Sequence, residues 1–134
     1  MSDGRHLAWW VMTLIASSGC VARCGEASQA TAAVPWDRIR STDARQRGRE
    51  LYLHYCVLCH GEHADGRGVR SMGLDRQPAD FTNQAWGDAG APLRVYRAIH
   101  DGVPGTPMPS WSALSDAEIW DLVSFVVSVN TQGA

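Results

Sequence analysis

The sequence predicts a helical domain, because three segments combine apolar residues at helical spacing with signals that start or stop a helix. These segments run over residues 43–59, 92–101 and 115–129. The stretches between them are rich in glycine, proline and charged residues, which is typical of loops. The length of 134 residues suits one domain. We therefore expect a small domain of helices joined by loops.

The first predicted helix runs from Asp43 to Cys59 and follows Ser41 and Thr42, either of which can act as its N-cap. Its apolar side is expected to carry Leu51, Tyr52 and Tyr55. Gly48 costs this helix about 1 kcal/mol relative to alanine. A glycine there favours close approach of another element, which we expect to be the last helix; the alternative is an incidental glycine on a solvated face.

The second and third predicted helices have clear starts. Pro92 begins the second, which ends at Gly102 and turns inward Leu93, Tyr96 and Ile99. The third opens with a capping box from Ser115 to Glu118 and runs to about Val129. Its core face is expected to consist of Ile119, Leu122, Val123 and Val126, widened by Trp120 and Phe125.

Residues 1–30 have the layout of a secretory signal: Arg5 precedes an apolar run from Leu7 to Gly19, and small residues follow. The run is shorter than the ~20 residues that a membrane-spanning helix needs. Three outcomes stay open, namely cleavage after Ala30, lipidation at Cys20 as in bacterial lipoproteins, and retention as an uncleaved anchor.

The remainder divides into a tether and a folded domain. Few large apolar residues occur from Gly25 to Pro35, so we expect a flexible tether over 31–40 and a folded domain over 41–134, beginning close to Trp36. Cys24 has no assigned role.

Composition excludes one class of partner. The net charge is −2, with 12 arginines and no lysine, which argues against nucleic-acid binding. A domain of about 100 residues also buries a limited fraction of its surface, so an internal apolar ligand would add to its stability.

The strongest motif is Cys56-Val57-Leu58-Cys59-His60, the CxxCH spacing of c-type haem attachment. On a helix, Cys56 and Cys59 share one face and can form two thioethers with one porphyrin edge. His60 follows directly and can serve as the proximal iron ligand. The alternatives are a thioredoxin-like dithiol, which needs a strand before the motif, and a zinc site, which needs a second ligand pair.

Haem bound through one histidine leaves an iron position for a second ligand. Met108 is the candidate, because it lies outside the predicted helices in a segment that Pro104, Pro107 and Pro109 hold rigid. Its rivals are Met72, His54, His63 and His100. Two further contacts are candidates. Arg70 could pair with a haem propionate, with a simply exposed arginine as the alternative. The carbonyl of Pro78 could accept from Nδ1 of His60, with an ordinary turn proline as the alternative.

Five motifs together resemble those of small bacterial class I cytochromes c with one haem. They are Gly48 to Tyr52, the CxxCH with Gly61, the segment from Ala64 to Gly68, and the segment from Gly102 to Pro109, followed by the pattern from Trp120 to Phe125. The resemblance implies an all-α fold of three to five helices around one covalent haem c, with His60 and Met108 as iron ligands. It further implies that the first and last helices cross near Gly48, and that Thr106 bonds a propionate. Trp111 is expected as a further haem contact.

The resemblance also implies the function, a one-electron carrier between respiratory or dehydrogenase partners rather than an enzyme. The first alternative is a haem subunit of a larger periplasmic dehydrogenase or oxidase, and the second a haem-based redox or gas sensor. Export to the periplasm is expected, with membrane association through the amino terminus as an option. The partners would be redox proteins, and the protein itself a monomer or a subunit of a complex.

Overall fold

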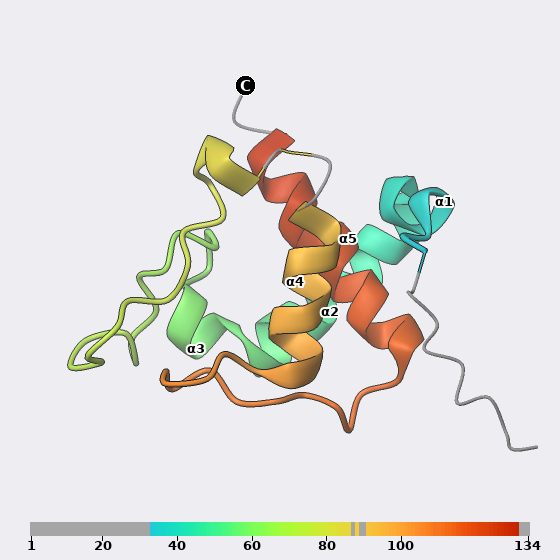
Figure 1. The fold of residues 1–134 in the computed structure, drawn as a ribbon. Coiled ribbons are helices and arrows are strands. Elements are labelled where there is room, and N and C mark those ends of the chain that lie inside the picture. The colour runs from blue at the N-terminus through green and yellow to red at the C-terminus, as the bar shows by residue number, and fades with distance from the viewer. Residues whose placement is uncertain (1–32, 87, 89–90, 132–134) are drawn as a thin grey trace, which may run out of the picture. The chain divides into compact units, whose positions relative to one another are not determined.

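The computed structural model describes residues 33–86, 88 and 91–131, and within these ranges it contains helices and loops but no strand. The elements in chain order are α1 (Trp36–Arg40), α2 (Thr42–Tyr55), α3 (Val57–His60), the 3-10 helix η1 (Gln84–Trp86), α4 (Ala91–Asp101) and α5 (Asp116–Thr131). This confirms the predicted all-α class. Figure 1 shows how the loops after α3 and α4 leave the helical part of the domain.

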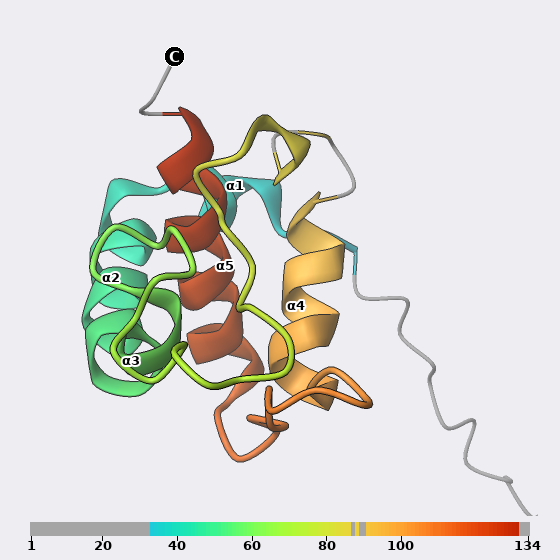
Figure 2. The ribbon, with the colours of Figure 1, turned by 90° about the vertical axis from the view of Figure 1, so that its left-hand side faces the viewer.

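Helix α5 is the centre of the packing, with α2 on one side and α4 on the other (Figure 2). The predicted core face of α5 is buried, from Ile119 through Leu122 and Val123 to Val126. Tyr52 of α2 and Ile99 of α4 pack against this face. The apolar stripe that the sequence predicted for α5 therefore fills the core.

Gly48 makes the closest approach between α2 and α5. A Cβ atom added at Gly48 would overlap the carbonyl oxygen of Asp121. The two helix backbones are thus in contact, as the sequence predicted for this glycine. The two helices also meet at Tyr52 and Phe125, whose ring centroids lie 4.9 Å apart.

Two of the three predicted helix starts, those of α2 and α5, have the expected caps. The hydroxyl of Ser41 accepts a hydrogen bond from the amide of Ala44 (3.3 Å). At the start of α5, the amide of Glu118 donates to the Ser115 hydroxyl (3.3 Å), and the amide of Ser115 donates to the Glu118 carboxylate (2.8 Å). These bonds satisfy amide groups that have no partner inside the helix.

Two expectations about element boundaries were wrong. The helix predicted from Asp43 to Cys59 is split at Cys56, whose φ of −113° departs from helical geometry. Within the tether expected over 31–40, residues 36–40 form α1 and Ile39 is buried in the core. The folded domain therefore includes α1, in agreement with the expected beginning near Trp36.

Helix α1 is fastened to the rest of the domain by polar contacts with α5. Asp121, only 3% exposed, accepts hydrogen bonds from Arg38 of α1 (2.7 Å) and Arg47 of α2 (2.8 Å). The Ser124 hydroxyl donates to the carbonyl of Ile39 (2.9 Å). One carboxylate thus connects three helices.

The expectations for residues 1–30, including cleavage after Ala30 and the roles of Cys20 and Cys24, lie outside the described residues. Among the helices that the structure does describe, none has the length and apolar character that crossing a bilayer requires.

Candidate haem site

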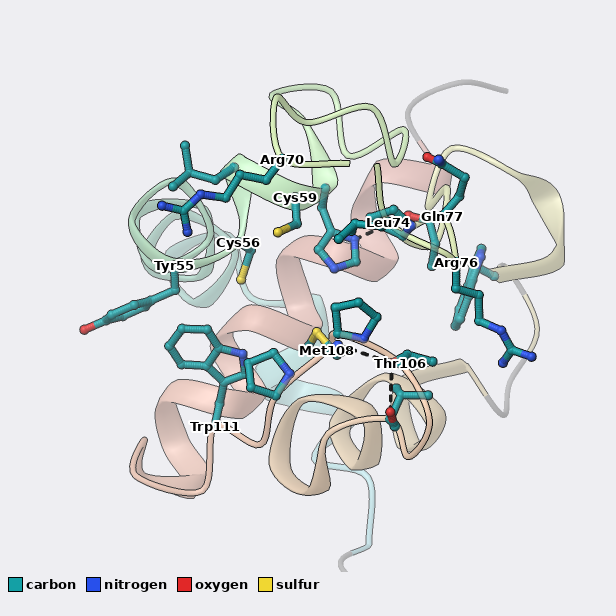
Figure 3. A pocket seen from close by; sticks show the side chains of 18 residues that line it. Tyr55, Cys56, Cys59, Arg70, Leu74, Arg76, Gln77, Thr106, Met108 and Trp111 are labelled. Atoms are coloured by element: carbon teal, nitrogen blue, oxygen red, sulfur yellow. Dashed lines mark hydrogen bonds between the residues drawn. The ribbon is translucent and has the colours of Figure 1, made fainter. Parts of the chain in front are cut away.

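A cavity of about 610 Å³ lies between the CxxCH segment, the loop over residues 70–79 and the proline-rich loop after α4. Figure 3 shows the sulfurs of Cys56 and Cys59 on one side of this cavity, with Met108 and Trp111 on another. Cofactor pockets typically have volumes of about 300–1,000 Å³. The cavity is therefore large enough for a cofactor.

The two thiols are presented by the break between α2 and α3. Cys56 occupies the break, and the amides of Cys59 (3.1 Å) and His60 (2.9 Å) both donate to its carbonyl. Both cysteines are free and partly buried. Burial, together with the nearby Cys59, raises the pKa of the Cys56 thiol to about 12. The break therefore turns two sulfurs toward one cavity.

His60 is held in the neutral form that iron ligation requires. Burial lowers the pKa of His60 more than its contact with the carbonyl of Ala79 raises it. Nδ1 lies 3.4 Å from that carbonyl oxygen, which can only accept, so the ring proton belongs on Nδ1 and Nε2 carries the lone pair. The ring also stacks on Phe81, with centroids 5.2 Å apart.

The expected partner of His60, the carbonyl of Pro78, was wrong by one residue. The carbonyl of Pro78 lies instead against Gly66, where an added Cβ would be 2.5 Å from its oxygen. Gly66 has a φ of +77°, which glycine adopts readily. Because the Pro78 carbonyl lies against Gly66, the carbonyl of Ala79 is the one within reach of the imidazole.

The segment after His60 folds back over the CxxCH turn. The amide of Gly66 donates to the carbonyl of His60 (2.9 Å), and that of Arg70 donates to the carbonyl of Leu58 (2.7 Å). Beneath them, the buried hydroxyl of Tyr52 donates to the carbonyl of Gly61 (2.6 Å). These bonds fix the backbone on both sides of His60.

Met108 lines the cavity from a different part of the chain, in the loop between α4 and α5. The rival ligands lie elsewhere: Met72 is 82% exposed, and none of Met72, His54, His63 and His100 is among the lining residues. Met108 is thus the one methionine that the described structure brings to the same cavity as His60.

The other expected haem contacts, Arg70, Pro78, Thr106 and Trp111, all line the cavity. Thr106 differs from expectation in one respect, because its hydroxyl donates its single proton to the carbonyl of Val103 (2.8 Å). The expected contact of Thr106 with a propionate stays a prediction. Arg70 is exposed at the rim, where it can reach a carboxylate.

Sequence reasoning missed several lining residues, among them Tyr55, Arg76 and Trp86. Tyr55 directly precedes Cys56, so its place in the chain could have indicated it. Arg76 lies in a loop and Trp86 ends the short 3-10 helix η1, and neither segment is long enough to show a periodicity in the sequence. Only the path of the chain brings these two residues to the cavity.

The donor set fits a c-type haem. Two thiols and a neutral imidazole stand within five consecutive residues, a thioether reaches the cavity from a distant loop, and the walls are mainly apolar with arginines at the rim. A zinc site is less well supported, because no group of three or more His, Cys, Asp or Glu side chains able to hold a metal ion occurs in the described ranges.

Comparisons with known proteins give the same cofactor. Residues 43–126 match the family model of cytochrome c oxidase, cbb3-type, subunit III. The chain is 37% identical over 90 residues to the cbb3-type cytochrome c oxidase subunit CcoP of Azospirillum brasilense, covering 65% of this chain and 30% of the relative. It is 32% identical over 103 residues to the cbb3-type cytochrome c oxidase subunit CcoP of Rhodobacter capsulatus, covering 71% of this chain and 31% of that relative.

A solved structure is similar as well, the Kuenenia stuttgartiensis reducing HAO-like protein complex Kustc0457/Kustc0458. Its TM-score is 0.60 at 31% identity, with 66% of this chain and 44% of that chain covered. The chain spans less than a third of the length of the CcoP relatives that it matches. Because the family model matches more than half of the chain, the chain belongs to the cbb3-type cytochrome c oxidase subunit III family, as a small c-type cytochrome with covalent haem c.

Proposed function

We propose that this protein is a one-electron carrier in which Cys56 and Cys59 attach the haem and His60 and Met108 are the iron ligands. The observation that carries the proposal is that His60 and Met108 line one cavity from segments 48 residues apart in sequence. The bound haem supplies a one-electron exchange between ferrous and ferric iron. The protein supplies the ligands and the apolar walls.

The chain's residues favour electron transfer over catalysis. With haem bound, a neutral His60 on one wall and Met108 on another would both hold the iron, which would leave no position for a substrate. The mainly apolar walls exclude water and so disfavour the additional positive charge of the oxidised state. Methionine ligation raises the potential further.

The name of the relatives supports a role inside a larger assembly. CcoP is a subunit of the cbb3-type oxidase, and this chain matches about 30% of the length of each CcoP relative. We propose that the chain passes electrons within an oxidoreductase complex whose other subunits are its redox partners. Mild purification of the native protein tests this, because a particle of one chain's mass would contradict it.

The proposed location is the periplasm, reached through the signal in residues 1–30. Anchoring by lipidation at Cys20 or by an uncleaved signal is the finer part of this proposal. The intact mass of the natively purified protein distinguishes the three forms, since cleavage, lipidation and retention change the mass by different amounts, and a single covalent haem adds its own mass.

The axial ligand is tested by Met108→Ala, with Met72→Ala as the matched control because Met72 is 82% exposed. Met108→Ala should lower the reduction potential and allow the ferrous protein to bind carbon monoxide, whereas Met72→Ala should do neither. An unchanged potential and spectrum in Met108→Ala would refute the assignment. Carbon monoxide binding by the unmodified protein would instead favour the sensor alternative.

A further inference from the structure

We propose that Thr106 is the positioning residue for Met108, and that its hydroxyl holds the backbone from which the methionine sulfur reaches the cavity. The proposal rests on the proposed function, because it concerns the ligand assigned there. It assigns Thr106 a role inside the loop.

The Thr106 hydroxyl makes two hydrogen bonds that together use its one proton and one of its lone pairs. It donates to the carbonyl of Val103 (2.8 Å) and accepts from the amide of Met108 (3.2 Å), as Figure 3 shows for the bond to Met108. A hydroxyl has one proton to donate. This hydroxyl therefore links the residue that begins the loop to the residue that carries the sulfur.

The amide of Met108 depends on this bond because of its neighbours in sequence. Pro104, Pro107 and Pro109 have no backbone N–H, so few donors exist in the loop to organise it. The amide of Met108 is one of them, and its acceptor is the side chain of Thr106. On the other side, the carbonyl of Met108 accepts from the amide of Val103 (3.2 Å). Met108 is thus held at both backbone groups.

Both ends of the loop are fastened independently of Thr106. Gly102 has a φ of +75°, and a Cβ there would press on the backbone of residues 108–110. The Ser110 hydroxyl donates to the carbonyl of His100 (2.6 Å), and the amide of Trp111 donates to that of Ile99 (2.9 Å). Loss of the Thr106 hydroxyl should therefore loosen the middle of the loop while its ends stay attached.

The test compares Thr106→Val, which removes the hydroxyl at nearly constant shape, with Thr106→Ser, which keeps it. In the haem-loaded protein, Thr106→Val should raise the hydrogen-exchange rate of the Met108 amide by roughly fivefold, as expected for one lost hydrogen bond. The concentration of added imidazole needed to displace Met108 from the iron should fall by a similar factor. Thr106→Ser should restore both values, and Thr42→Val, at the exposed start of α2, should change neither.

Several outcomes would overturn the proposal. These are an unprotected Met108 amide in the unmodified protein, an unchanged exchange rate in Thr106→Val, or a Thr106→Ser variant that behaves like Thr106→Val. Failure of the axial assignment looks different, because Met108→Ala would then leave the spectrum unchanged while the Met108 amide of the unmodified protein still reports the Thr106 bond. The two proposals can therefore fail separately.

Discussion

Gly48 of α2 lies against the carbonyl of Asp121 in α5, with no room for a side chain between the two backbones. The side chain of Asp121 meanwhile binds Arg38 and Arg47. The same residue of α5 thus contributes its backbone to the closest helix contact and its carboxylate to the ion pairs that hold α1. Stability should be unusually sensitive to changes at either residue.

Gly48→Ala should destabilise the protein, although alanine is the better helix former by about 1 kcal/mol. The added methyl group meets rigid backbone and forces α2 and α5 apart, so we expect a loss of about 2 kcal/mol or more in the free energy of unfolding. Urea unfolding measures it, with Gln46→Ala on the exposed side of α2 as control. A Gly48→Ala protein more stable than the parent would contradict the contact.

Asp121→Asn should weaken the protein at neutral pH and matter less in acid. Burial alone would raise the pKa of Asp121, but hydrogen bonds from Arg47 and Arg38 outweigh it, so the pKa lies below its usual value. A carboxylate with a depressed native pKa stabilises the fold above its unfolded pKa of about 4, and this contribution is lost as the pH falls through the native pKa.

We expect Asp121→Asn to cost about 2 kcal/mol at pH 7, the scale of a hydrogen bond to a charged group. Urea unfolding of parent and variant at neutral and acidic pH measures the difference, which should shrink in acid. Asp75→Asn, at an exposed position, is the control. A difference that stays constant with pH would show that the charge of Asp121 is not what stabilises the fold.

Tyr52→Phe should cost about 1–3 kcal/mol, because the buried carbonyl of Gly61 loses the hydroxyl that donates to it. The ring contact with Phe125 is kept, so the loss reports the hydrogen bond. Tyr55→Phe is the matched control, since Tyr55 is 38% exposed. Thermal unfolding of the two variants checks the contrast, and equal losses would mean that the bond to Gly61 is not responsible.

Gly66→Ala and Gly73→Ala form a second matched pair. Both glycines have a positive φ, so both variants carry backbone strain of about 1 kcal/mol or more. A Cβ at Gly66 would press on the Pro78 carbonyl, whereas one at Gly73 meets no atom within 4 Å. Gly66→Ala should therefore lose about 1–2 kcal/mol more. Gly66→Ala should also shift the reduction potential, because displacing Pro78 moves the neighbouring carbonyl of Ala79, which contacts Nδ1 of His60. An equal shift of the potential in Gly73→Ala would exclude that explanation.

Local signals allowed much of the fold to be predicted from the sequence. The Ser41 cap, the capping box at Ser115 and the glycine at position 48 each act through neighbouring backbone atoms, or through the absence of a side chain, and each is found as predicted. The CxxCH motif is likewise local, because one turn of chain places its three functional side chains.

What could not be predicted depends on contacts between distant segments. The choice of Ala79 over Pro78 as the partner of His60 follows from the packing of Pro78 on Gly66, which no spacing reveals. Helix α1 has only five residues and is held by Asp121 and Ser124, more than 80 positions away. The pattern of apolar residues in α2 likewise does not indicate that the helix ends before Cys56.

The proline-rich loop has a further property that follows from its hydrogen bonds. Those that close it, from Ile99 and His100 to Ser110 and Trp111, have both partners within residues 99–111. The hydrogen bonds that close the loop are consequently encoded by a short continuous piece of chain, while Trp111 also contacts Tyr55 of α2. Residues 99–111 should therefore keep their hydrogen bonds when they replace the corresponding loop of another helical haem protein. The backbone of Met108 would then retain its present conformation.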